Sequence, residues 1–125
     1  MKKMTKIEII TRQEKLESLK DAMNQIGVTG MTVTHVLGYG LQKGHTEVYR
    51  GTAYNVTLLP KVKVEIVVCE VPVEEVIQTA KRICHTGNVG DGKIFVYGID
   101  NAVRIRTGEE GTAAIIDPAD INKLK

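Results

Sequence analysis

Four stretches of the chain carry the apolar pattern of β-strands. In residues 61–69, Val62, Val64 and Ile66 alternate with lysine and glutamate, which is typical of a half-buried strand. Residues 6–11 place Ile7 and Ile9 on one face, and residues 31–37 and 93–99 are rich in β-branched or aromatic side chains. The pattern therefore predicts strands over 6–11, 31–37, 61–69 and 93–99, with a short further strand over 103–106.

Two other stretches repeat apolar residues at spacings of three and four, as one face of a helix does. The first stripe ends just before Gly27, and the second begins just after Pro72, which suits a first helical turn. The stripes are formed by Leu16, Leu19, Met23 and Ile26, and by Val73, Val76, Ile77, Ala80 and Cys84.

The predicted order is strand, helix, strand, strand, helix, strand. This βαββαβ order indicates an α+β, ferredoxin-like fold. Two helices can cover only one face of the sheet, yet residues 94–97 are apolar on both faces. A homo-oligomer is the simplest way to bury the second face.

Between the second and third strands, residues 38–57 lose all apolar periodicity and contain four glycines. A stretch of about 20 residues without regular structure is usually functional or disordered, and a protruding loop is the prediction. We expect one domain over residues 1–115, including this loop, and a separate C-terminal tail over 116–125.

Composition excludes several classes of function. The chain has 125 residues, 42% of them apolar and 26% charged, with a net charge of +2. That charge argues against broad capture of nucleic acid, and the absence of Trp and the single Phe argue against an RNA-binding ferredoxin-like module. No apolar run approaches the ~18 residues of a membrane span. Two cysteines do not make a disulfide framework, so we expect a cytoplasmic protein.

The glycine-rich segment 87–93 is the first candidate for chemistry. Its glycines let backbone N–H groups converge on an anion, and Lys93 adds a positive charge. The spacing of Gly87, Gly92 and Lys93 imitates a Walker A motif, but Ile94 stands where Ser or Thr must hold Mg²⁺. The predicted context is also helix–loop–strand, the reverse of a Walker loop. An ordinary tight turn explains these residues equally well.

Arg104 and Arg106 are the second candidate. On a strand they would share one face, where two guanidinium groups suit a polyphosphate. For the arginines alone, a solvated strand face with glutamate partners is the favoured alternative. We expect the shared sheet to bring them near the glycine turn, which would favour phosphate binding instead. Cys69 and Cys84 are better explained as core residues than as nucleophiles.

Several long motifs in order resemble the P-II family of nitrogen-regulatory signal-transduction proteins. The resemblance runs from about residue 6 to 115. It is carried by Gly-Met-Thr-Val-Thr (30–34), Gly-Tyr-Gly-Leu-Gln-Lys-Gly-His-Thr-Glu-Val-Tyr-Arg-Gly (38–51), Leu-Pro-Lys-Val-Lys-Val-Glu-Ile-Val-Val (59–68), Thr-Gly-Asn-Val-Gly-Asp-Gly-Lys-Ile-Phe-Val (86–96) and Val-Arg-Ile-Arg-Thr-Gly-Glu-Glu (103–110).

This resemblance implies a homotrimer that is a sensor and not an enzyme. ATP and ADP would compete for clefts between subunits, and 2-oxoglutarate would bind together with Mg²⁺ and ATP. The long loop would then select targets, which in the family include ammonium transporters, nitrogen-metabolism enzymes or regulators, and modifying enzymes. Contact with a membrane would occur only through a channel partner, and no nucleic acid is implied.

The resemblance also implies roles for individual residues. The nucleotide would contact Thr32, Gly40, Leu41, Gln42, Val67, Gly90, Asp91, Gly92, Lys93, Arg104 and Arg106. Among these, Thr32 and Val67 match the positions of the adenine pocket, and Leu41 stands where the family usually has arginine. The residues implied for 2-oxoglutarate are Arg12, Gln42, Lys61 and Gly90, and Gln42 would also ligate Mg²⁺. In the loop, Tyr49, Arg50 and Tyr54 would bind partners, and Tyr54 matches a tyrosine that some members carry nucleotidylated.

A small nucleotide-dependent enzyme that hydrolyses ATP is the alternative, because the same residues can polarise a γ-phosphate. It lacks a visible base or a carboxylate that would position water.

Overall fold

A computed structural model describes residues 3–39 and 58–115 of the chain. The strands are β1 (Met4–Arg12), β2 (Thr32–Gly38), β3 (Leu59–Val68) and β4 (Lys93–Ile99). The helices are α1 (Leu16–Gln25) and α2 (Val73–Cys84), with 3-10 turns η1 (Gln13–Lys15) and η2 (Gly111–Ala114). Each of the four main strands and both helices lies where the apolar pattern predicted it.

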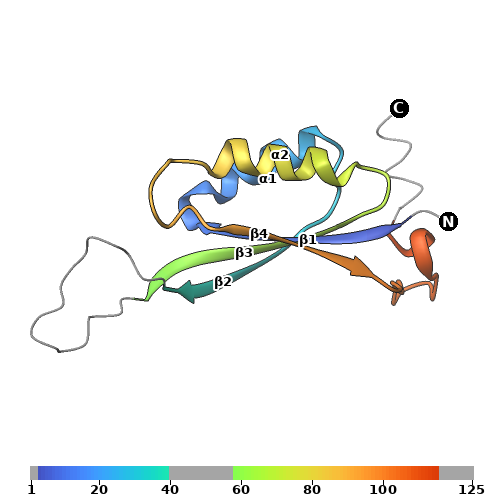
Figure 1. Cartoon of the computed structure of the whole chain (residues 1–125). Coiled ribbons are helices and arrows are strands. Elements are labelled where there is room, and N and C mark those ends of the chain that lie inside the picture. Colours follow the sequence, from blue (N-terminus) through green and yellow to red (C-terminus); the bar gives the residue numbers. More distant parts are fainter. Residues whose placement is uncertain (1–2, 40–57, 116–125) are drawn as a thin grey trace, which may run out of the picture.

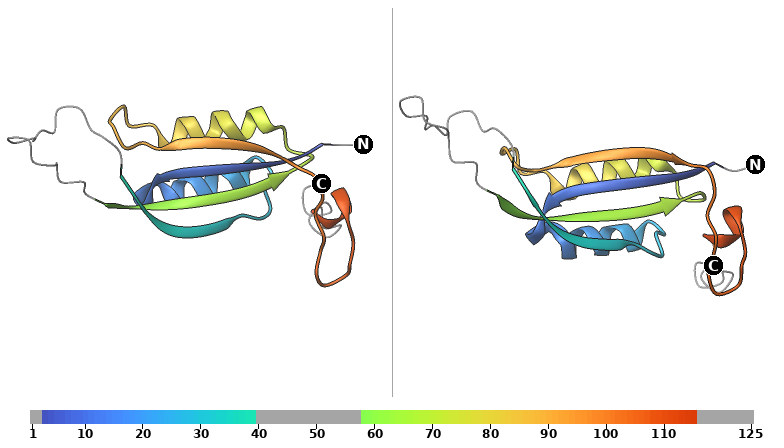
Figure 2. Two further views of the ribbon diagram at one scale, coloured as in Figure 1. Left: turned by 60° about the horizontal axis from the view of Figure 1, so that its bottom comes forward. Right: turned by 90° about the horizontal axis from the view of Figure 1, so that it is seen from below.

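The four strands form one antiparallel sheet in the order β2-β3-β1-β4. Both helices pack on the same face of this sheet, and the other face is left open (Figures 1 and 2). The order of elements and this two-layer arrangement confirm the predicted ferredoxin-like α+β fold. Because β1 and β3 are the central strands, they contribute most of the buried side chains.

The core lies between the sheet and the helices, and its members share near-complete burial. Every second residue of β1 and β3 points to the helix side of the sheet, because side chains alternate between the two faces of a strand. These residues pack there against the apolar stripes of the helices, whose side chains repeat about every 3.6 residues. Fully buried side chains are Ile7, Ile9, Val62, Val64 and Ile66 from the sheet, and Leu19, Met23, Val76 and Ala80 from the helices.

The open face of the sheet is polar at its centre and aromatic at β4. Lys6 Nζ lies 2.8 Å from a carboxylate oxygen of Glu65 and 4.9 Å from the centre of the Tyr97 ring. Phe95 and Tyr97 remain 41% and 43% exposed. In the described part of the chain, these aromatic residues, for which the sequence predicted burial, are therefore left partly exposed.

The predicted strand over 103–106 is wrong. Val103 forms only an isolated bridge with Glu110, and residues 105–107 form a turn. The Gly108 N–H donates to the Arg104 carbonyl at 2.7 Å, and the Arg104 N–H donates to the Glu109 carbonyl at 2.8 Å. Gly108, at φ +76°, allows this tight reversal. The alternation that placed Arg104 and Arg106 on one strand face therefore does not apply.

Neither α1 nor α2 has the length and apolar character needed to cross a membrane, and no other long helix occurs in residues 3–39 and 58–115. Most of the predicted loop (all but residues 38 and 39) and the whole of the predicted tail lie outside the described residues.

Candidate ligand-binding site

The glycine-rich segment joins the end of α2 to the start of β4, which is the helix–loop–strand context predicted for it. Gly92 has a φ of +107° and packs directly against the backbone of β1. A Cβ at this position would lie 1.8 Å from the carbonyl oxygen of Ile10. Only glycine allows the segment to lie this close to the sheet.

Asp91 organises the segment from within. Its carboxylate accepts hydrogen bonds from the backbone N–H groups of Thr86 (2.7 Å) and Gly87 (2.9 Å) and from the hydroxyl of Thr86. The guanidinium Nε of Arg12 lies 3.4 Å away. These bonds, above all those from Thr86, hold the pKa of Asp91 well below its usual range. The carboxylate is thus directed into its own loop.

Arg12 and Lys61 bring positive charge to the same place. They are paired residues at adjoining ends of β1 and β3. Lys61 Nζ donates to the Gly90 carbonyl at 2.5 Å, and Arg12 Nη2 donates to the Val89 carbonyl at 2.8 Å. Three predicted 2-oxoglutarate contacts, Arg12, Lys61 and Gly90, therefore lie together. A fourth, Gln42, lies outside the described residues.

Asp91→Asn is expected to lower the melting temperature at neutral pH, because the ionised form is the one that its donors stabilise. Since the folded-state pKa is depressed, this stabilisation exists above the unfolded pKa of about 3.9 and is lost as pH falls through the folded value. Melting curves of both proteins between pH 7 and pH 3 check this. The difference between them should shrink below about pH 4. A difference that stays constant down to pH 3 would contradict the role of the charge.

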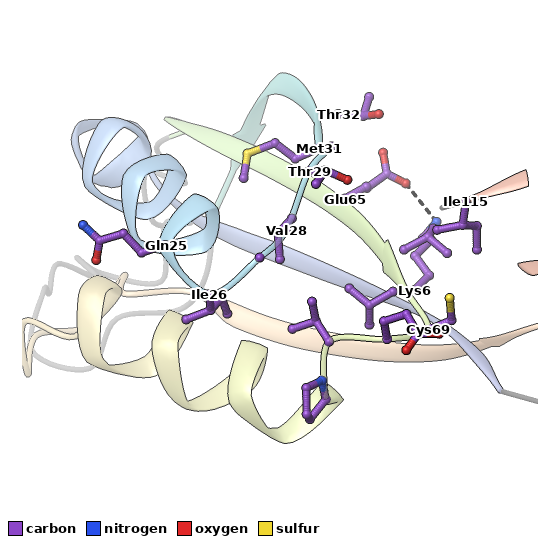
Figure 3. Close-up of a pocket in the computed structure, with 17 residues that line it drawn as sticks. Lys6, Gln25, Ile26, Val28, Thr29, Met31, Thr32, Glu65, Cys69 and Ile115 are labelled. Carbon is purple, nitrogen blue, oxygen red and sulfur yellow. Dashed lines mark ion pairs between the residues drawn. The ribbon is translucent and has the colours of Figure 1, made fainter. Parts of the chain in front are cut away.

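A pocket of about 930 Å³ lies at the opposite end of the sheet, where β2 begins and β3 ends. Its wall includes Thr32 and Val67, the two residues predicted to contact the adenine, and also Lys6 and Glu65 (Figure 3). The remaining lining is largely apolar. The predicted adenine residues therefore share one cavity of suitable size for a nucleoside.

The end of β4 lies at this same end of the sheet, because Ile99 pairs with Met4 and Thr5 pairs with Val68. Arg104 and Arg106 follow β4 in the chain, at the turn over residues 105–107. The guanidinium group of Arg104 donates to the Ala114 carbonyl through Nη2 at 3.3 Å and lies 3.7 Å from a Glu109 carboxylate oxygen. Arg106 is exposed. The two arginines are separated from the glycine-rich segment by the seven residues of β4, about 20 Å of strand. Within one protomer, the expected proximity of the arginines to the glycine turn is wrong.

The remaining predicted site residues lie outside the described residues. These are Gly40, Leu41, Gln42, Tyr49, Arg50 and Tyr54. Among the described residues, no group of three or more His, Cys, Asp or Glu side chains is arranged to hold a metal ion.

Sequence reasoning missed Thr11 and Thr86. The hydroxyl of the fully buried Thr11 donates to the Asp91 carbonyl at 2.8 Å, and Thr86 donates to the Asp91 carboxylate. A threonine just after a helix end and five residues before an aspartate is a weak signal for such a contact. Thr11 offered no signal, because its partner is 80 residues away.

Comparison with known proteins identifies the family. The model of the family "Nitrogen regulatory protein P-II" matches residues 4–109. The nitrogen regulatory protein P-II 1 of Escherichia coli K12 and the P-II protein of Rhodospirillum rubrum are each 53% identical over 112 residues. Each match covers 90% of this chain and all of the relative.

Solved structures agree with these sequence matches. The structure of Bacillus subtilis GlnK superposes with a TM-score of 0.77 at 53% identity, covering 90% of this chain and 98% of that one. A structure described as a GlnK–ATP complex from the same species superposes with a TM-score of 0.78 at the same identity, covering 90% and 97%. The chain is thus a regulator and not an enzyme: it belongs to the P-II family of nitrogen regulatory signal-transduction proteins.

Proposed function

We propose that this protein senses ATP, ADP and 2-oxoglutarate in clefts between the subunits of a homotrimer. The observation that carries the proposal is the division of the predicted ligand residues between two ends of one protomer. Lys93 and the glycine-rich segment lie at one end of β4, whereas Thr32, Val67 and Arg104 lie toward the other. One nucleotide cannot reach both ends of the same chain. A second copy supplies the missing half.

The exposed open face supports assembly of this kind. Phe95 and Tyr97 are half-exposed aromatic side chains of β4. Their burial against another copy of the chain would stabilise the assembly. The GlnK–ATP complex, which superposes over nearly its whole length, supports ATP as a ligand of the cleft. In the cleft, Lys93 and the backbone N–H groups of residues 90–92 would bind phosphates, joined by Arg104 and Arg106 from the neighbouring subunit.

Arg12 and Lys61 are the residues that we assign to 2-oxoglutarate. They are two adjacent cations whose contacts in the glycine-rich segment are mainly neutral carbonyl groups. A dicarboxylate can replace those carbonyls as a stronger, charged acceptor. Asp91 does not oppose this, because its carboxylate already accepts hydrogen bonds from Thr86, Gly87 and Arg12.

Mg²⁺ fits this site only with the help of the ligands. The carboxylate of Asp91, within the glycine-rich segment, already accepts hydrogen bonds from its own loop and is therefore not available as a ligand. We therefore assign Mg²⁺ to the oxygens of ATP and 2-oxoglutarate together with Gln42. The ion would offset the repulsion between a triphosphate and a dianion.

The loop over residues 38–57 would carry the output, because it connects β2 and β3 directly beside Lys61. Tyr49, Arg50 and Tyr54 are the proposed contacts for a partner such as an ammonium transporter or a nitrogen-metabolism enzyme or regulator. Tyr54 is also the proposed modification site. We place the protein in the cytoplasm, in keeping with cysteines that form no disulfide.

Titration of 2-oxoglutarate into the protein with Mg²⁺ tests the proposal. Calorimetry in the presence of no nucleotide, ADP or ATP should show binding only with ATP. Because coupling is reciprocal, 2-oxoglutarate should then raise ATP affinity by the same factor. A folded trimer that binds neither adenine nucleotide would refute the sensor. Equal 2-oxoglutarate binding with no nucleotide, with ADP and with ATP would refute the composite site.

A further inference from the structure

Three successive carbonyl groups of the glycine-rich segment accept hydrogen bonds from side chains at the ends of β1 and β3. The pairs are Arg12 with the Val89 carbonyl, Lys61 with the Gly90 carbonyl and Thr11 with the Asp91 carbonyl. Thr11 differs from the two cations, because it is uncharged and only 1% exposed. A ligand cannot contact a side chain this deeply buried, so any effect of Thr11 on binding must pass through Asp91.

The place of Thr11 in the sheet explains this contact. Thr11 pairs with Val62 on β3, and both side chains are buried on the face of the sheet that carries the core. The glycine-rich segment lies over this end of β1, with Gly92 packed against the backbone at Ile10. Burial shields the hydrogen bond between Thr11 and the segment from competing water, which makes it stronger than an exposed one.

The carbonyl that Thr11 holds belongs to the peptide bond between Asp91 and Gly92. This bond is trans, since the described residues contain no cis peptide. In a trans peptide the C=O and N–H groups point in opposite directions. Because the Asp91 carbonyl points to Thr11 in the core, the Gly92 N–H points away from Thr11 and out of the core.

This peptide needs such a hold, because the residue that follows it is a glycine. When a peptide plane turns over, ψ of the residue before it and φ of the residue after it change together. Glycine takes positive and negative φ about equally well, so the φ of +107° at Gly92 could change sign at little cost. The plane would then present a carbonyl oxygen where it had presented an N–H, and an oxygen repels a phosphate.

We propose that Thr11 is a positioning residue for nucleotide binding: its buried hydroxyl keeps the Asp91–Gly92 peptide turned so that the Gly92 N–H faces the phosphates. This deepens the proposed function and rests on it, because the phosphates are assigned there to the N–H groups of residues 90–92. When a dicarboxylate takes Arg12 and Lys61, two of the three carbonyls lose their partners. Only the Asp91 carbonyl keeps its own.

Thr11→Val is the test variant, because valine keeps the shape of threonine and lacks the hydroxyl. Thr11→Ser, which restores the hydroxyl without the methyl group, is the rescue. Thr79→Val is the matched control, since Thr79 is also buried, at 6% exposure, but lies on α2. Thr11→Ala, which also lacks the hydroxyl, replaces the valine variant if that protein does not fold.

Two readouts are made on the full chain. The first is ATP affinity, measured by calorimetry. The second is the nuclear Overhauser effect between the Asp91 Hα and the Gly92 amide proton, measured by NMR without any ligand. The distance between these two protons depends on ψ of Asp91, so the effect changes when the peptide turns over. It therefore reports the orientation of the peptide directly.

Thr11→Val is expected to bind ATP about tenfold more weakly, as when about one molecule in ten keeps the competent orientation. Tenfold is near the upper end of what one neutral hydrogen bond contributes. The nuclear Overhauser effect should change in Thr11→Val. Thr11→Ser should bind ATP within about threefold of the parent protein, and Thr79→Val should match the parent in both readouts.

An unchanged nuclear Overhauser effect in Thr11→Val would overturn the positioning role, whatever happens to ATP. A changed effect with unchanged ATP affinity would overturn the link to binding. A loss of affinity that Thr11→Ser does not restore would overturn the role of the hydroxyl. If the parent protein binds no adenine nucleotide, the proposed function fails, whereas a changed effect in Thr11→Val still shows that Thr11 orients the peptide.

Discussion

Gly92→Ala is expected to destabilise the protein by about 3–5 kcal/mol, which is a large part of the stability of a typical small domain. Two effects add. The backbone at φ +107° is unfavourable for any residue with a Cβ, which costs about 1–2 kcal/mol. The new Cβ would also lie 1.8 Å from the Ile10 carbonyl oxygen, so the loop must move off β1. Urea unfolding followed by circular dichroism measures the loss.

Two other glycines separate these effects. Gly87 also has a positive φ, of +90°, but a Cβ there would meet only the flexible His85 side chain, at 3.8 Å. Gly87→Ala should therefore cost only the backbone term, about 1–2 kcal/mol. Gly30 has open space around it, and Gly30→Ala should change stability by less than about 1 kcal/mol. Equal losses at Gly92 and Gly87 would show that the close approach to β1 is unimportant.

Lys61→Met is expected to weaken 2-oxoglutarate binding in the presence of Mg²⁺ and ATP by about 100-fold. The substitution keeps the length of the side chain and removes its charge. A hydrogen bond to a charged group contributes about 1.5–3 kcal/mol, and the upper value corresponds to this factor. Calorimetric titration measures the change. ATP binding without 2-oxoglutarate should remain within about threefold of the parent protein, because the phosphates are assigned to Lys93 and the arginines.

Lys63→Met is the matched control. Lys63 lies two residues further along β3, so both side chains are on the same face of the sheet, and the charge change is identical. In register, Lys63 pairs with Ile10, whereas Lys61 pairs with Arg12 beside the glycine-rich segment. A loss of 2-oxoglutarate affinity in Lys63→Met as large as that in Lys61→Met would indicate a general charge effect and contradict the assignment.

The two arginines show where sequence reasoning reached its limit. Alternation placed Arg104 and Arg106 on one strand face, but the positive φ at Gly108 and the hydrogen bond between Gly108 and Arg104 make a turn there. A three-residue alternation is too short to distinguish a strand from a turn. The distance between the two arginines and the glycine-rich segment could not be predicted either, because this distance depends on the direction in which β4 runs.

By contrast, the motif residues beside the glycine-rich segment were predicted, and the fold explains why they meet. Arg12 and Lys61 are 49 positions apart, but antiparallel pairing of β1 with β3 makes them direct neighbours. The resemblance to the P-II family named both as ligand residues. Their mutual contact with residues 89 and 90 came only from the structure.

The elements and the two layers of the fold could be predicted from the apolar pattern of the chain alone. Periods of 2 and 3.6 residues in the apolar pattern are local properties, so they indicated the four main strands, the two helices and the buried faces of β1, β3 and both helices. The tertiary structure was needed to show that the predicted ligand residues are divided between two ends of the sheet, that Asp91 binds within its own loop, and that Ile115 lies at the pocket. These features depend on strand direction, register and contacts between residues far apart in the chain, and no local pattern encodes them.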